Sequence, residues 1–135
     1  MTFLDKGADT ESVRRYQRLE WGRIKGDTCL IELSGLAAHD LGVFRDRERF
    51  RQERIEVIRE RLRQTAPSLV VLYGTMDRPS WGKIAGRAFP AEDIIISDGT
   101  TLAVTAHPNY KRANAYWVER GQRLREVALR VGANI

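Results

Sequence analysis

Residues 68–74 read SLVVLYG, a short and continuous apolar run that follows Pro67 and stops at a glycine. A strand with apolar side chains at successive positions is typical of a parallel sheet that is covered on both faces, because a sheet with one solvated face alternates apolar and polar residues. Pro67 ends the segment before this run, because proline disfavours the helical conformation of the residue that precedes it. We therefore predict an α/β fold built around this strand.

The segments around this strand alternate between helical and extended patterns. Residues 45–64 predict an amphipathic helix, and so do residues 113–130 and the segment that starts at Asp9 or Thr10. Residues 28–34 predict a buried strand, and the Asp98-Gly99 pair predicts a turn between two β-branched runs in residues 94–106. The order predicts a single three-layer α/β/α domain over residues 1–135, with a mainly parallel central sheet that contains residues 28–34, 68–73 and 101–106, and with residues 1–8 as a loose end.

The apolar face of the helix at 45–64 is expected to bury a defined set of side chains. Its predicted members are Phe50, Arg54, Val57, Ile58 and Leu62, with Ile55 at the edge. Eight arginines and five acidic residues occupy the same segment, so a solvated outer face with i,i+4 pairs is favoured there over a nucleic-acid contact.

Composition narrows the classes of partner and compartment. The formal net charge of +5 favours polyanionic partners, nucleic acid above all, although high genomic GC content would also enrich arginine. No apolar run approaches the roughly 20 residues of a membrane helix, and no secretory signal is visible, so we expect no membrane association. Cys29 is the one cysteine and is expected in a buried strand, which favours a reducing cytoplasm.

Ligands of parallel α/β sheets bind outside the carboxyl ends of the strands. The predicted strand ends present Glu32 and Ser34, then Tyr73 and Gly74, then His107 and Asn109. Lys111 and Arg112 follow directly, with Tyr110 between them and the asparagine. We therefore expect a binding crevice at this edge of the sheet.

Three pieces in this order resemble the uracil-DNA glycosylase superfamily over residues 28–125. They are the strand that ends in LIELSGLA, the helix before PSLVVLYG, and the strand that ends in His107-Pro108-Asn109 before an aromatic-containing helix. The pattern departs from the family in three places. The segment that positions the hydrolytic water is not found before Asp27, Glu32 stands where a base-reading asparagine is expected, and Asn109 to Arg112 replace the family's wedge sequence.

The resemblance implies roles for these residues. His107 would stabilise charge that develops on a base oxygen, and Glu32, Ser34, Tyr73, Gly74 and Asn109 would contact the base. A carboxylate at position 32 would accept from a base N–H or amine, which suits a base other than uracil. The nucleic-acid contacts expected on these grounds are Tyr110, Lys111, Arg112, Trp81 and Lys83, because cations bind phosphates and aromatic rings stack on bases.

Simpler interpretations stay open for the same residues. His107 can cap a turn that Pro108 ends, Glu32 can pair with an arginine, and core packing is favoured for Trp81 and for the helical Trp21 and Trp117. Scattered histidines and a single cysteine match no metal site, and no nucleotide-binding fingerprint is present, so no metal or cofactor is expected.

Two classes of function remain. The first is a glycosylase-like fold that binds nucleic acid or a nucleobase with weak or no glycosylase activity, which the missing water-positioning segment favours. The second is an active DNA glycosylase, and a protein-interaction module on the same fold is a further alternative. The sequence leaves the oligomeric state open, and it leaves open that the chain is part of a longer protein.

Overall fold

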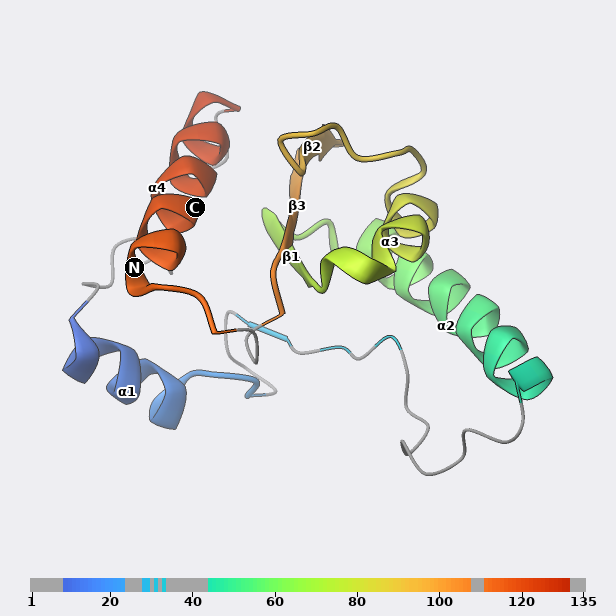
Figure 1. Ribbon diagram of the computed structural model, residues 1–135, viewed down its shortest axis with the longest axis horizontal. Coiled ribbons are helices and arrows are strands. Elements are labelled where there is room, and N and C mark those ends of the chain that lie inside the picture. The colour runs from blue at the N-terminus through green and yellow to red at the C-terminus, as the bar shows by residue number, and fades with distance from the viewer. Residues whose placement is uncertain are drawn as a thin grey trace. The chain divides into compact units, whose positions relative to one another are not determined.

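The computed structural model describes residues 9–23, 28–29, 31, 33, 44–107 and 111–131, without the side chains of residues 44–46. The chain divides into two compact units, one over residues 1–32 and one over residues 33–134 (Figure 1). The single domain over residues 1–135 stays a prediction. Among the described helices, none is both long enough and apolar enough to cross a membrane.

The first unit contains helix α1, Thr10–Leu19. Asp9 is its N-cap, since the carboxylate accepts from the backbone N–H groups of Glu11 and Ser12 and thereby satisfies two donors that the first turn leaves unpaired. The hydrogen bond of the Ser12 side chain, followed by these backbone bonds, lowers the pKa of the Asp9 carboxyl below its usual value. The predicted helix start at Asp9 or Thr10 is confirmed.

Tyr16 is the buried residue of α1 and connects the helix to the chain that follows. Its hydroxyl lies 3.1 Å from Thr28 Oγ1, and Gly22 N donates to the same oxygen. The Trp21 ring meets the Tyr16 ring edge-on but is 41% exposed, so the prediction that Trp21 belongs to the core is wrong. Cys29 is also exposed, which corrects its predicted burial.

Among the residues that the structure describes, the second unit is built on a three-stranded sheet in the order β1-β3-β2. Strand β1 is Leu69–Tyr73, β2 is Ile94–Ser97 and β3 is Thr100–Thr105. The β1 and β3 strands pair in parallel, and β2 pairs with β3 in antiparallel. The sheet is therefore mixed, and the predicted mainly parallel sheet is corrected: a two-residue hairpin joins β2 to β3, and such a short connection permits only antiparallel pairing.

The strand predicted at residues 28–34 is not found in the described part of that segment. Residues 28, 29, 31 and 33 belong to no strand, and residues 30, 32 and 34 lie outside the described residues. The strands predicted at 68–73 and 101–106 are confirmed within one residue of their ends.

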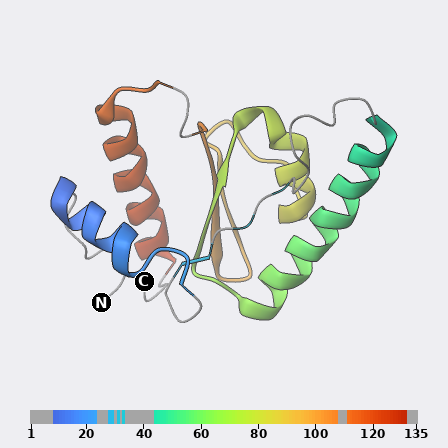
Figure 2. The same ribbon diagram turned by 90° about the horizontal axis from the view of Figure 1, so that it is seen from below.

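Helices lie on both faces of this sheet (Figure 2). Helix α4, Asn114–Arg130, lies on one face, and the short α3, Arg78–Ala85, lies on the other with α2, Phe44–Thr65, packed against it. All residues of β3 are buried, because this strand has a neighbour at each edge and a helix over each face. The α/β class is thus established, and the helices predicted at 45–64 and 113–130 are confirmed.

The buried face of α2 differs from the predicted one. Ile55 is only 1% exposed and Ile58 6%, whereas Val57 is 48% exposed. The prediction is therefore corrected at two positions, since the sequence predicts Ile55 at the edge of the buried face and Val57 within it. The helical period of α2 allows either of two neighbouring rows of apolar side chains to be buried, and contact with α3 decides which row it is.

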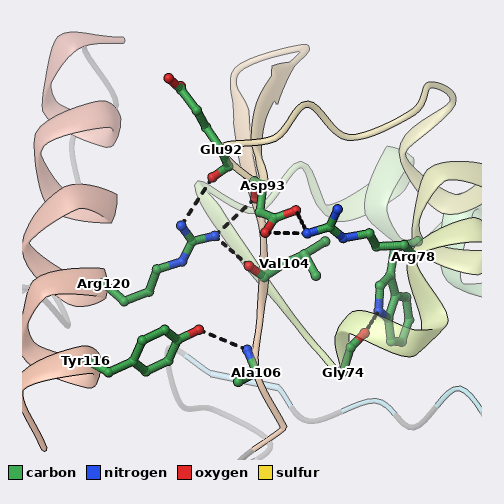
Figure 3. A network of polar contacts seen from close by, with 9 residues as sticks. Gly74, Arg78, Glu92, Asp93, Val104, Ala106, Tyr116 and Arg120 are labelled. Atoms are coloured by element: carbon green, nitrogen blue, oxygen red, sulfur yellow. Dashed lines mark hydrogen bonds and ion pairs between the residues drawn. The ribbon is translucent and has the colours of Figure 1, made fainter. Parts of the chain in front are cut away.

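The β2–β3 ladder ends next to Asp93, which directly precedes β2 and has a φ of 57°. The residue opposite is Val104, whose N–H donates to Asp93 O at 2.9 Å. The reciprocal bond is missing because Asp93 N donates to Pro90 O instead. Arg120 of α4 supplies the missing donor, since its Nη2 donates to Val104 O and also to Asp93 O (Figure 3).

Candidate functional site

Parallel pairing brings the carboxyl ends of β1 and β3 to the same edge of the sheet. Tyr73 lies opposite Thr105, and Gly74 N donates to Thr105 O at 2.9 Å, so the pairing continues one residue past β1. The chain leaves β3 through Ala106 and His107 at this edge. The predicted meeting of these two strand ends is confirmed.

Gly74 shapes the exit from β1. Its φ of 107° lies in the region that glycine adopts without strain, and a Cβ there would lie 3.3 Å from Asp77 Oδ2. Its carbonyl accepts a 2.8 Å hydrogen bond from Trp81 Nε1, which fixes α3 to the end of the strand. These contacts give Gly74 a structural role at the edge, and its predicted contact with a base stays a prediction.

Tyr73 is half-buried at the last position of β1. Burial raises the pKa of its phenol above the usual value, because desolvation disfavours the phenolate. Like the hydroxyl of any tyrosine at neutral pH, the Tyr73 hydroxyl is able to donate a hydrogen bond.

An ion pair beside this edge involves residues that the sequence did not single out. Arg51 Nη1 of α2 lies 3.2 Å from Asp77 Oδ1, just past the end of β1. The two residues are far apart in sequence and each has many possible partners, so no local pattern predicted the pair. Its effect is to hold the carboxylate next to Gly74 and to connect α2 with the 3-10 turn Thr75–Asp77.

Lys111 and Arg112 are exposed cations on the segment that enters α4. The Arg112 guanidinium lies over the Tyr116 ring, 5.4 Å from its centroid. The Tyr116 hydroxyl accepts from Ala106 N at 3.2 Å, so the ring is attached to the carboxyl edge of β3 (Figure 3). Together these contacts place Arg112 beside the strand end.

His107 is exposed and directly follows the buried end of β3. Two hollows lined by described residues lie elsewhere in the second unit, and neither is lined by His107. The predicted position at a strand end is confirmed, and the predicted pocket in front of the imidazole stays a prediction.

Trp81 and Lys83 both lie on α3. Trp81 is 7% exposed, so its ring is not available for stacking on a base and the core interpretation is correct. Lys83 lies in the last turn of α3, and its Nζ donates to Gln52 Oε1 at 3.3 Å.

Four predicted site residues lie outside the described residues: Glu32, Ser34, Asn109 and Tyr110. Pro108 lies outside them as well. Within the described ranges, no group of three or more His, Cys, Asp or Glu side chains is placed to hold a metal ion.

The described side chains at the edge offer a consistent chemistry. Two cations suit phosphate oxygens, a protonated phenol and an imidazole can form hydrogen bonds with a base, and the nearby carboxylate of Asp77 is paired with Arg51. This set can bind an anionic, base-containing ligand.

Comparison of the chain with protein-family models, with curated proteins and with solved structures gave no match in any of the three.

Proposed function

We propose that this chain binds nucleic acid at the carboxyl edge of its sheet, on a uracil-DNA glycosylase-like form of the three-layer α/β fold, with little or no glycosylase activity. One observation carries the proposal. The parallel register of β1 and β3 brings the two strand ends together where His107, Lys111 and Arg112 are exposed. The cytoplasmic location expected from the sequence belongs to the same proposal.

Anchored cations at a sheet edge suit the phosphate backbone. Neutralising phosphates releases counterions, and this supplies most of the affinity of sequence-independent binding. Arg112 is held over Tyr116, which is itself bonded to Ala106, so the guanidinium loses less side-chain freedom on binding than a cation without contacts.

The residues favour binding over hydrolysis of a glycosidic bond. Hydrolysis needs a water aimed at the sugar carbon, and the carboxylate described beside the edge, Asp77, is engaged by Arg51. The family's water-positioning segment is not recognised in the sequence, and Glu32 replaces the asparagine that would read uracil. An active glycosylase is therefore the second candidate.

A charge-reversal experiment tests the proposed interface. K111E/R112E is compared with R125E/R130E, which makes the same change in net charge at exposed positions in the second half of α4. We expect the first variant to weaken oligonucleotide binding at low salt by about tenfold or more, and the second much less, because only the first removes phosphate contacts. Fluorescence anisotropy with single-stranded and duplex DNA across a salt series measures both effects.

The same experiment distinguishes the alternatives. Absence of binding at low salt, or an equal loss in both variants, would exclude a nucleic-acid interface at this edge and leave the protein-interaction module. Efficient excision of uracil by the wild type, slowed about a hundredfold or more in His107→Ala, would instead establish the active glycosylase. Equal behaviour of His107→Ala and wild type in excision and binding would mean that His107 only ends the strand.

A further inference from the structure

A second basic site lies in a hollow of about 680 Å³ between α2 and α3, and its lining includes neither His107 nor Lys111 nor Arg112. One wall comes from α2, through Glu56 and Arg59. The other wall comes from α3 and from the segment that follows it, as far as Phe89. Two stretches of the second unit that are separate in sequence therefore contribute to one surface.

The side chains that line this hollow are predominantly cationic. They include four cations, Arg59, Arg78, Lys83 and Arg87, and the single carboxylate of Glu56. Glu56 is engaged by Arg59 at 3.6 Å, and Arg78 is paired with Asp93 outside the lining. The unbalanced positive charge therefore resides on Lys83 and Arg87.

Lys83 and Arg87 are both exposed and are held by neutral groups. Lys83 Nζ donates to the amide oxygen of Gln52 at 3.3 Å, and Arg87 Nη2 donates to Ile96 O at 2.6 Å. Within the described part of the chain, neither has a carboxylate partner. Each keeps donors for a further acceptor, since an ammonium has three and a guanidinium five.

Backbone geometry leaves room beside Gly86, which lines the hollow and where an added Cβ would meet no atom within 4 Å. Gly86 has a φ of 76° and ends α3 in the left-handed conformation, so the chain turns there. At Gly82 a Cβ would lie 3.4 Å from Arg87 O, so this glycine allows the segment after α3 to lie close to the helix. The hollow therefore stays open at Gly86.

We propose that this hollow binds a small polyphosphate anion, contacted by Lys83 and Arg87. Several cations spread around one hollow match a ligand with several charged phosphate groups, and arginine matches phosphate oxygens with paired donors. The site is independent of the edge at Lys111 and Arg112.

Tripolyphosphate is the probe for this site, with its binding measured by isothermal titration calorimetry at low ionic strength. K83Q/R87Q is compared with R125Q/R130Q, which makes the same change in net charge on α4. We expect saturable binding with one site per chain, weakened about tenfold or more in K83Q/R87Q and by less than about twofold in the control. Because Arg87 also bonds Ile96 O, the single variant Lys83→Gln is measured as well, and circular dichroism verifies that each variant is folded.

Three results would overturn the proposal. The first is the absence of saturable binding by the wild type, and the second is an equal loss in the two double variants, which would mean a response to net charge alone. The third is weaker binding of an oligonucleotide to K83Q/R87Q with unchanged binding of tripolyphosphate, which would assign these cations to a nucleic-acid interface. K111E/R112E is expected to bind tripolyphosphate like the wild type. Failure of the proposed nucleic-acid edge and failure of the proposed polyphosphate site are therefore distinguishable.

Discussion

A side-chain donor from Arg120 replaces a backbone hydrogen bond that is missing between Asp93 and Val104. The left-handed conformation of Asp93 directs its N–H to Pro90, and the guanidinium of α4 donates to the carbonyls of Glu92, Asp93 and Val104 instead. The Asp93 carboxylate meanwhile binds Arg78 of α3. One turn residue therefore connects the helices on the two faces of the sheet.

Replacing Arg120 by glutamine should destabilise the protein by about 2 kcal/mol, because partly buried carbonyls lose charged donors. Arg123→Gln is the matched control, since Arg123 forms an exposed ion pair with Glu92 and its loss should cost less than about 1 kcal/mol. Urea unfolding followed by circular dichroism gives both free energies. Equal values for the two variants would contradict the role given to Arg120.

At the level of elements, the β2–β3 hairpin depends on its two-residue turn. Asp98 and Gly99 both have positive φ, 49° and 80°, as a type I′ turn requires. Ser97 pairs with Thr100 directly across the turn. The predicted Asp98-Gly99 turn is confirmed, and its conformation fixes the register of the hairpin.

Alanine at two glycines should have opposite effects on stability. Gly99→Ala should destabilise by about 1–2 kcal/mol, because a Cβ is strained at positive φ although no atom blocks it. Gly121→Ala lies within α4 with open space around the new methyl group, and it should stabilise by about 0.5–1 kcal/mol. Thermal and urea unfolding measure both changes. Stabilisation by Gly99→Ala would disprove the turn conformation.

At the level of the whole molecule, two substitutions in α2 test which face of this helix is buried in the second unit. Ile55→Ala should destabilise by about 2–5 kcal/mol, since it removes a fully buried side chain and leaves a cavity. Val57→Ala, two residues away, should change the free energy of unfolding by less than about 0.5 kcal/mol because Val57 is exposed. Urea denaturation of the two variants compares them directly, and a larger effect at Val57 would mean that α2 presents the other face.

Local chemistry made the main elements of the second unit predictable. The apolar run at residues 69–73, the Asp98-Gly99 turn and the charge-rich helix at 44–65 each carry a signal within a few residues. The strand ends at Gly74 and His107 followed from these elements, and so did their meeting at one edge. Two contacts could not be predicted in this way: the ion pair of Arg51 with Asp77, and the hydrogen bond from Arg120 to Val104 O. Both join residues that are separated by long stretches of chain.

By itself, the sequence determined the helices, the strands of the second unit, the hairpin turn and the basic segment at Lys111 and Arg112, because periodicity, turn residues and charge act over a few positions. Only the tertiary structure decided that Trp81 is a core residue, that Ile55 and not Val57 is buried, and that the sheet is mixed. It also assembled the hollow around Lys83 and Arg87 from α2, α3 and the segment beyond. The physical reason is that burial and charge clustering depend on which surfaces meet, and residues distant in sequence make those surfaces.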